Sequence, residues 1–172
     1  MRGWLIPLAA FIVAAFAGWQ LALAYTPDVL MRLAERRVAA VGKGYNHFTH
    51  GPLVTAASRT IVRPSPDLLY SSCPFDVAGG PVLIDVAPVP APYWSLSVFD
   101  GRTNTAFVRN NGEAPGGVRI ALVQAGQAAP AGYQPVPVPQ PRGIALLRVL
   151  IDRTKPIIGI DAARHRATCR AG

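Results

Sequence analysis

The N-terminal segment constrains this chain most, because no charged residue occurs between Gly3 and Pro27. As an α-helix, the stretch from Trp4 to Tyr25 would extend about 33 Å, which is enough to cross the hydrocarbon core of a membrane. Tryptophan and tyrosine near its ends favour the membrane–water interface. The segment therefore predicts a transmembrane signal anchor over residues 1–25, which contacts membrane lipid through residues 4–25.

A cleaved signal peptide is the first alternative for this segment. Ala22, Leu23 and Ala24 form the small-x-small pattern that precedes a signal-peptidase site, so cleavage after Ala24 would release the rest of the chain. The apolar run is longer than the roughly 7–15 residues of an ordinary signal peptide, which favours an uncleaved anchor. A buried helix of a soluble protein is the other alternative.

Two opposing signals bear on the side of the membrane that the rest of the chain occupies. Four basic residues follow the span closely whereas Arg2 alone precedes it, and charge counting would keep the C-terminal part in the cytoplasm. The signal-like start and the two cysteines favour export instead. We expect a single-pass inner-membrane protein with its domain on the periplasmic side, or a secreted periplasmic protein after cleavage at Ala24.

Residues 26–44 predict a separate juxtamembrane helix. Thr26, Pro27 and Asp28 have the order of a capping residue, a first-turn proline and an acid at the positive end of the helix dipole. The helix either links the membrane to the domain and packs on it, or lies against anionic headgroups. The apolar residues that recur at helical spacing are Leu30, Leu33, Ala34, Val38 and Val41.

The remainder of the chain, residues 45–172, predicts a β-sandwich domain with a C-terminal helix. Short β-branched runs alternate with turns that contain glycine or asparagine, and adjacent runs are expected to pair as hairpins. No helical pattern separates the runs, which is typical of an antiparallel β-sandwich or jelly roll. The expected strands are Arg59–Val62, Pro81–Ala87, Tyr93–Phe99, Thr105–Arg109, Val118–Gln124 and Gly143–Ile151.

Two further segments complete the mainly β domain and its short flanking helices. Residues 128–142 contain five prolines, and alternate prolines remove the donors that a central strand needs. We expect a polyproline segment on the surface, with a docking peptide for a partner as the alternative. Near the C-terminus, Asp161 is expected to cap a helix over Ala162–Arg170.

Composition limits the partners and the chemistry. The chain has 17 basic and 9 acidic residues, a formal net charge of +8, which favours anionic partners. The basic residues are scattered without an interleaved aromatic patch, and together with the anchor this argues against a nucleic-acid partner. No motif of serine hydrolases, metalloproteases or nucleotide-binding proteins occurs, so enzyme activity is without support in the sequence.

The two cysteines, Cys73 and Cys169, are not part of a C-x-x-C motif, which argues against a zinc ribbon or a thioredoxin-like site. In an oxidising compartment an even number of cysteines favours a disulfide between them; two unpaired buried thiols or a catalytic cysteine are the alternatives. His47 and His50 have loop-type neighbours and lack a nearby acid or cysteine to complete a metal's ligands. We expect no metal site and no cofactor.

Several motifs in a fixed order carry a resemblance to a known family. They lie at residues 58–71, 75–82, 93–100 and 103–104 and have the sequences SRTIVRPSPDLLYS, FDVAGGPV, YWSLSVFD and TN. Over about residues 45–152 the chain resembles the bacterial envelope family of unknown function numbered twelve fifty-four. The resemblance implies an all-β sandwich, a membrane anchor in short members, and a companion envelope protein of the family numbered twelve fourteen. It implies no known reaction.

The same motifs supply a candidate site for a polar ligand. Arg63 and Asp67 flank a Pro-Ser-Pro turn, where an ion pair between them would brace the loop. With Tyr70, Asp100 and Asn104 they could meet at one end of the sandwich and grip the ligand, although turn chemistry accounts for the same residues.

Two functional hypotheses follow from the sequence. The first is a membrane-anchored envelope protein that acts as a binding or assembly module. The alternative is an envelope enzyme that acts on a carbohydrate or a small acidic substrate, with Asp67 or Asp76 as acid or base.

Overall fold

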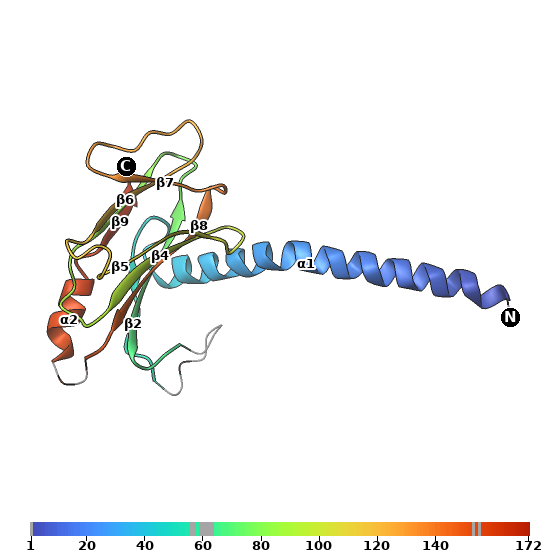
Figure 1. Ribbon diagram of the computed structural model, residues 1–172, viewed down its shortest axis with the longest axis horizontal. Coiled ribbons are helices and arrows are strands. Elements are labelled where there is room, and N and C mark those ends of the chain that lie inside the picture. Colours follow the sequence, from blue (N-terminus) through green and yellow to red (C-terminus); the bar gives the residue numbers. More distant parts are fainter. Residues whose placement is uncertain (1, 56–57, 59–63, 153, 155) are drawn as a thin grey trace.

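The computed structural model describes residues 2–55, 58, 64–152, 154 and 156–172. A short 3-10 turn, η1 (Arg2–Trp4), leads into the long helix α1 (Leu5–Val41), and helix α2 (Ile157–Arg164) lies near the C-terminus (Figure 1). The strands are β1 (Thr49–His50), β2 (Leu68–Asp76), β3 (Val82–Val86), β4 (Trp94–Asp100), β5 (Thr105–Asn110), β6 (Val118–Val123), β7 (Gln134–Pro137), β8 (Arg142–Leu150) and β9 (Thr168–Ala171).

The strands form two sheets that enclose one apolar core. The five-stranded sheet has the order β1-β2-β8-β4-β5 and the four-stranded sheet the order β7-β6-β3-β9. Neighbouring strands are antiparallel, except that β6 and β7 are parallel. Side chains from both sheets, such as Trp94, Leu147, Ile84 and Ile120, meet in the core. The mainly β sandwich expected from the sequence is therefore formed.

Most expected strands are present, but their pairing differs from the expectation. Five of the six runs coincide with β3, β4, β5, β6 and β8, while the run Arg59–Val62 lies outside the described residues. Of the expected hairpins between these runs, β4 and β5 form one. The others are wrong, because β3 pairs with β6 in the opposite sheet from β4 and β5. A turn that contains glycine permits the chain to cross between sheets as well as to reverse within one.

The proline-rich and C-terminal segments both contribute edge strands. As expected, Pro135 and Pro137 do not lie in a central strand. The expected polyproline segment is wrong for residues 134–137, however, because they form the edge strand β7 beside β6, and an edge position tolerates proline. The expected helix over 162–170 is wrong. Asp161 lies inside α2 and does not cap it, and residues 168–171 form β9, which pairs with β3.

The predicted disulfide is present between Cys73 and Cys169, whose Cα atoms are 6.5 Å apart. Cys73 belongs to β2 in the five-stranded sheet and Cys169 to β9 in the four-stranded sheet. The bond therefore joins the two layers of the sandwich, and it ties a strand, not the expected C-terminal helix, to the rest of the domain.

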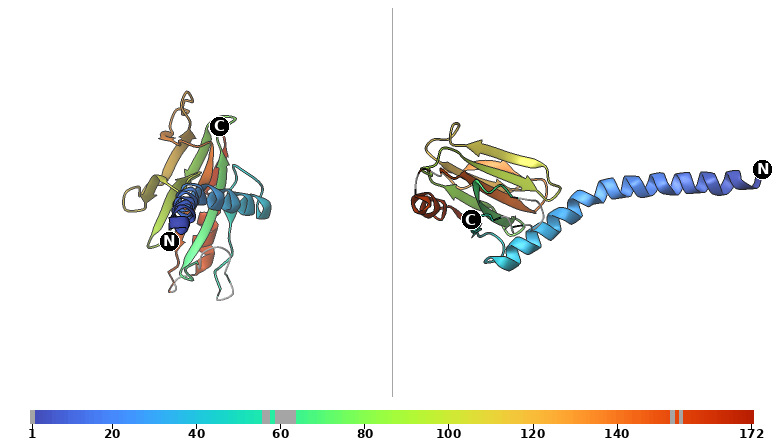
Figure 2. Two further views of the ribbon diagram at one scale, coloured as in Figure 1. Left: turned by 90° about the vertical axis from the view of Figure 1, so that its right-hand side faces the viewer. Right: turned by 90° about the horizontal axis from the view of Figure 1, so that it is seen from below.

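Helix α1 is continuous through the expected start of a second helix, so the prediction of two helices is wrong. The Thr26 hydroxyl does not cap a new helix; it donates to the carbonyl oxygen of Ala22, 2.5 Å away, within the same helix. Pro27 removes one backbone donor from the helix interior, which is a common cause of a bend. Figure 2 shows α1 changing direction partway along its length.

The two parts of α1 have different surroundings. Every described side chain from Gly3 to Thr26 is exposed, and the helix is long and apolar enough to cross a membrane. Beyond Pro27 the helix packs on the sandwich, where Met31 and Glu35 are buried. The buried face coincides only in part with the expected apolar stripe: Ala34 and Val38 are half-buried, but Leu30 and Leu33 remain 53% and 50% exposed. The domain thus covers a helix face that carries a carboxyl group.

Candidate functional site

A cleft of about 350 Å³ lies where the second half of α1 meets the sandwich. One wall is the helix, and the other walls are the ends of β2 and β8 together with the turn between β4 and β5. The charged residues that line it are Asp28, Arg32, Glu35, Arg36, Asp76 and Arg142. Opposite charges therefore share one small space beside the second half of α1.

Asp76 and Arg142 form the fixed part of this cleft. They are cross-strand neighbours of β2 and β8, and the Arg142 Nε donates to Asp76 Oδ2 at 2.7 Å. Burial alone would raise the pKa of Asp76, but hydrogen bonds from the Ala78 amide and Arg142, together with the charge of Arg142, outweigh it and lower the pKa. The Arg142 guanidinium also lies over the Tyr45 ring, 5.2 Å from its centroid. Asp76 is therefore an ionised, engaged carboxylate.

Glu35 is the exceptional group of the cleft. Its residue is 2% exposed, and within the described part of the chain its carboxyl group has no hydrogen bond or ion pair. Burial raises the pKa of Glu35, opposed by the charges of Arg142 and Arg32. The carboxyl oxygens keep contact with the open cleft, since they are not among the fully buried side-chain atoms that lack a hydrogen bond.

Gln140 supplies a second acceptor without a donor. The Oε1 atom of its side chain is buried and has no hydrogen-bond partner among the described residues. Gln140 lines the same cleft as Glu35. Because buried polar atoms are nearly always hydrogen-bonded, the Gln140 Oε1 atom indicates that a donor-bearing group belongs in this cleft, which the Glu35 carboxyl group also lines.

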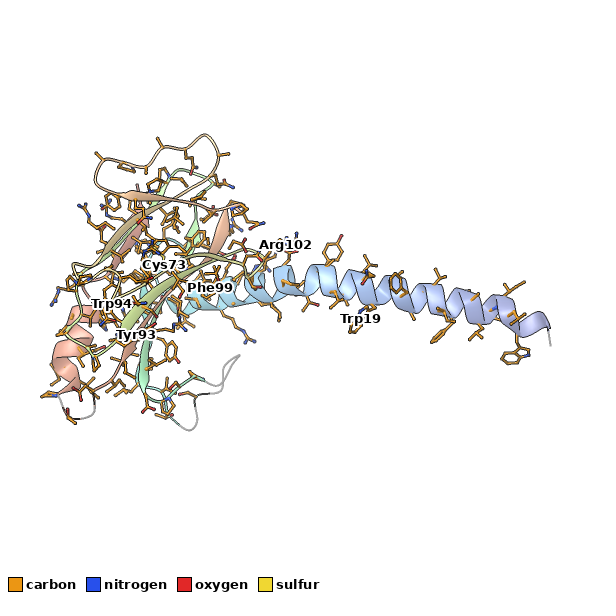
Figure 3. The ribbon with its side chains drawn as sticks, viewed as in Figure 1. Trp19, Cys73, Tyr93, Trp94, Phe99 and Arg102 are labelled. Carbon is orange, nitrogen blue, oxygen red and sulfur yellow. A yellow bond between two sulfur atoms is a disulfide. The ribbon has the colours of Figure 1, made fainter. Side chains whose placement is uncertain are left out.

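The turn between β4 and β5 closes the cleft and holds the helix. Asp100 is buried, and its carboxylate accepts hydrogen bonds from the amides of Arg102 and Asn104, at 2.8 and 2.9 Å, and from the Asn104 side chain at 3.0 Å. This turn directs Arg102 to α1, where its Nη2 donates to the Ala24 carbonyl at 3.3 Å and its Nε lies 3.6 Å from Asp28. Figure 3 shows Arg102 beside the helix. Asp100 and Asn104 are thus positioning residues for this wall.

Comparison with known proteins identifies the domain. The family described as "Protein of unknown function (DUF1254)" matches residues 45–171. The chain belongs to this family. No curated protein matches it.

Two crystal structures share the fold of this DUF1254 chain. The VPA0106 protein from Vibrio parahaemolyticus is similar with a TM-score of 0.66 and 17% identity, over 86% of this chain and 35% of that protein. A putative uncharacterized protein from Burkholderia cenocepacia is similar with a TM-score of 0.51 and 15% identity, over 80% of this chain and 39% of that protein. The chain thus spans little more than a third of either protein, and the likeness is one of fold.

The DUF1254 motif residues do not converge as the sequence suggested. In the five-stranded sheet, Leu68 pairs with Leu150 and Asp100 pairs with Gly143. Positions 143 and 150 are about 23 Å apart along β8, at about 3.3 Å per residue. Figure 3 shows this separation, with Tyr93 and Trp94 at one end of β4 and Phe99 and Arg102 towards the other. The candidate residues that the structure describes therefore do not meet at one end of the sandwich.

The individual candidates fall into two groups. Asp100 and Asn104 adjoin the junction cleft, whereas Asp67 and Tyr70 lie at the opposite end, where the Tyr70 hydroxyl accepts a hydrogen bond from the Ser65 amide at 2.9 Å. Arg63 lies outside the described residues. A ligand-binding role for each group stays a prediction.

The histidines gather at another depression. His50 stacks on His165 with ring centroids 4.1 Å apart, and its Nδ1 lies 2.9 Å from the Ser71 hydroxyl. The exposed His47 lines the same depression, with its Nδ1 at 2.8 Å from the Tyr45 carbonyl oxygen. Within the described residues, no group of three or more His, Cys, Asp or Glu side chains is placed to hold a metal ion.

Sequence reasoning missed the residues that make the junction cleft unusual: Glu35, Gln140 and Arg142. One signal for Glu35 was available, because it follows Met31 by four residues and therefore lies on the same helix face. No comparable local signal marks Gln140, which precedes a proline at the end of the proline-rich segment.

Proposed function

We propose that this DUF1254 protein is a membrane-anchored envelope module that binds a small polar ligand in the cleft between its anchor helix and its sandwich. The observation that carries the proposal is Glu35, which is buried and without a partner among the described residues while Leu30 and Leu33 on the same helix stay exposed. Packing a leucine against the domain would stabilise the junction more. The carboxyl group is therefore placed for contact with something other than the protein itself.

Two features support the anchoring and the location. The uncharged part of α1 exposes large apolar side chains, including Phe11, Phe16 and Trp19, that water would solvate poorly. The bond between Cys73 and Cys169 favours an oxidising compartment, since thiols of cytosolic proteins are kept reduced. We infer a single-pass inner-membrane protein with the sandwich on the periplasmic side.

A mass spectrum of the protein extracted in mild detergent from its own envelope tests this arrangement. We expect a chain that begins at Met1 and is lighter than the reduced chain by two hydrogens. A chain that begins at Tyr25 would contradict the permanent anchor, and reduced Cys73 and Cys169 would contradict the periplasmic location. Protease digestion of spheroplasts is the companion measurement, because a periplasmic sandwich is degraded from outside the cell.

A second candidate function is an envelope enzyme that acts on a carbohydrate or a small acidic substrate. It is favoured by the opposite pKa shifts of two carboxyl groups that line one cleft, raised for Glu35 and lowered for Asp76. Such divergence is typical of acid–base pairs. The test is turnover of a substrate panel by the extracted protein: a reaction lost in Glu35→Gln and Asp76→Asn but kept in Glu113→Gln would favour the enzyme over the binding module.

A further inference from the structure

Two guanidinium groups at the junction cleft are not engaged by the protein. Arg32 and Arg36 lie one helical turn apart on α1 and both line the cleft. Among the described residues neither forms an ion pair or a side-chain hydrogen bond, whereas Arg142 is paired with Asp76 and Arg102 with Asp28. Guanidinium groups in this arrangement favour a phosphate or carboxylate, to which they donate several charge-assisted hydrogen bonds.

The same cleft also presents acceptors. The Glu35 carboxyl group and the Gln140 Oε1 atom both lack donors within the described part of the chain. A primary ammonium carries three N–H donors and a positive charge, so one such group can satisfy both acceptors and give Glu35 an ion-pair partner. The guanidinium groups and the acceptors that line the cleft together fit a compact group that carries both an anion and an ammonium.

The position of the cleft along α1 relates it to a membrane surface. Asp28 and Arg36 follow Tyr25, the last residue of the apolar span, by about 5 and 16 Å along the helix axis, at about 1.5 Å per residue. The headgroup layer on each side of a bilayer is about 5–8 Å thick, as the difference between a total of about 40–45 Å and a core of about 30 Å. Asp28 thus lies at the depth of the headgroup layer, whereas Arg32, Glu35 and Arg36 lie about 10–16 Å beyond Tyr25, so a headgroup must extend out of this layer to enter the cleft.

We propose that the junction cleft binds phosphoethanolamine, with the phosphate held by Arg32 and Arg36 and the primary ammonium by Glu35 and Gln140. The volume of about 350 Å³ accommodates such a small group. The ligand is the headgroup of a neighbouring lipid or a soluble phosphodiester of the same chemistry. The inference rests on the proposed binding function, because both use the same cleft. Only the lipid as a source of the ligand depends on the membrane anchor.

The first test compares two soluble compounds that differ in their donors. Glycerophosphoethanolamine and glycerophosphocholine carry the same phosphate and the same positive charge, but the choline nitrogen has no N–H group. We expect calorimetric titration of the full chain in detergent to give binding of the ethanolamine compound about tenfold tighter than binding of the choline compound, because the buried acceptors stay unpaired with choline. Equal affinities, or no binding of either in solution or in a bilayer, would overturn the proposal.

Variants then identify the groups. Glu35→Gln keeps the size of the side chain and removes its charge, and we expect it to weaken the ethanolamine compound about tenfold. Glu113→Gln, at the other glutamate of the chain, is the matched control and should bind like the unaltered protein. Arg32→Gln is expected to weaken both compounds, since they share the phosphate. An unchanged affinity in Glu35→Gln would contradict the assigned ammonium site.

Bilayers of defined composition distinguish a lipid headgroup from a soluble compound as the source of the ligand. The full chain is placed in nanodiscs that contain phosphatidylethanolamine or phosphatidylcholine, and lipids that remain bound are counted by native mass spectrometry. Selective retention of phosphatidylethanolamine, lost in Glu35→Gln, identifies the headgroup as ligand; binding of the soluble compound alone identifies a free phosphodiester. If the chain is anchored and oxidised but prefers neither glycerophosphoethanolamine nor phosphatidylethanolamine, the phosphoethanolamine site is refuted. The proposal of an anchored envelope protein then still stands. If the chain begins at Tyr25, it lacks the anchor, and a lipid headgroup is ruled out as the source of the ligand. The titration with the two soluble compounds would still test whether the cleft binds phosphoethanolamine.

Discussion

Cys73 and Cys169 join the two layers of the sandwich across a sequence separation of 96 residues. Both residues are buried, at 0% and 4% exposure. The four-residue strand that contains Cys169 lies at an edge and pairs on one side with β3. The bond is therefore the covalent link that holds the C-terminal edge strand to the opposite sheet.

Removal of this bond should lower the free energy of unfolding by about 4 kcal/mol, because a long closed loop restricts the unfolded chain. The variant is Cys73→Ala with Cys169→Ala, and the measurement is urea unfolding of the detergent-solubilised protein followed by tryptophan fluorescence. The unaltered protein in reducing agent should match the variant. An equal stability of the oxidised and reduced chains would contradict the prediction.

Arg164 is buried and ties α2 to the end of β2. Its Nη1 donates to the carbonyl oxygens of Tyr70, at 2.6 Å, and Gly51, at 3.2 Å, and its Nε and Nη2 donate to Asp161. Arg164→Met keeps apolar bulk but removes these hydrogen bonds. The Tyr70 carbonyl oxygen still accepts from the Gly51 amide, so the expected cost is about 1–3 kcal/mol of stability.

Chemical unfolding of Arg164→Met beside Arg166→Met checks this cost. Arg166 is exposed, so its replacement should change the free energy of unfolding by less than about 0.5 kcal/mol. Equal effects of the two substitutions would show that the buried hydrogen bonds of Arg164 contribute no net stability.

Local patterns in the sequence were sufficient for much of the fold. The alternation from Trp94 to Val98 predicts β4, and the Asx chemistry of Asp100 predicts the turn that follows it. Both signals lie within a few residues of the element that they specify. The C-terminal strand was missed because Arg164–Arg170 has a polar, helix-like composition, and its strand conformation depends on pairing with β3 and on Cys169.

The unusual part of the candidate site was not predictable in the same way. Glu35 and Gln140 are separated by more than a hundred positions, and their importance lies in shared burial without donors. The apolar spacing of Leu30 and Leu33 even favoured the wrong face of the helix for packing. Arg102 contacts α1 through the Ala24 carbonyl oxygen and Asp28, and no local pattern in the sequence reports this contact between distant segments.

His50 should make stability depend on pH. Its pKa is lowered from 6.5 to about 4, mainly by burial and also by the charges of His165 and Arg164, while the charge of Asp161 opposes the shift. The unfolded chain then binds more protons than the folded chain between those values, so stability should fall as the pH falls from about 6.5 to about 4. Allowing for partial exposure, the expected loss is about 1–2 kcal/mol.

Unfolding free energies of His50→Gln across this pH range measure the effect. The variant should lose most of the dependence between pH 6.5 and 4, because the titrating ring is gone. His47→Gln is the control, since His47 is exposed and lies outside the stack with His165, and it should keep the dependence. A dependence retained in full by His50→Gln would assign it to other groups.

Thr103 has a left-handed backbone conformation, which is unfavourable for threonine. It lies in the turn between β4 and β5 with φ of 67°, a region that β-branched residues rarely adopt. Thr103→Gly should relieve this strain and raise the free energy of unfolding by about 0.5–1 kcal/mol, although the added freedom of the unfolded chain offsets part of the gain.

The control is Thr105→Gly within β5, which should lower stability by about 1 kcal/mol because a strand residue gains nothing from glycine. Urea unfolding should show changes of opposite sign in the free energy of unfolding of the two variants. A loss of stability in Thr103→Gly would contradict the prediction, because the threonine side chain would then stabilise the turn beside Asp100 more than its backbone conformation strains it.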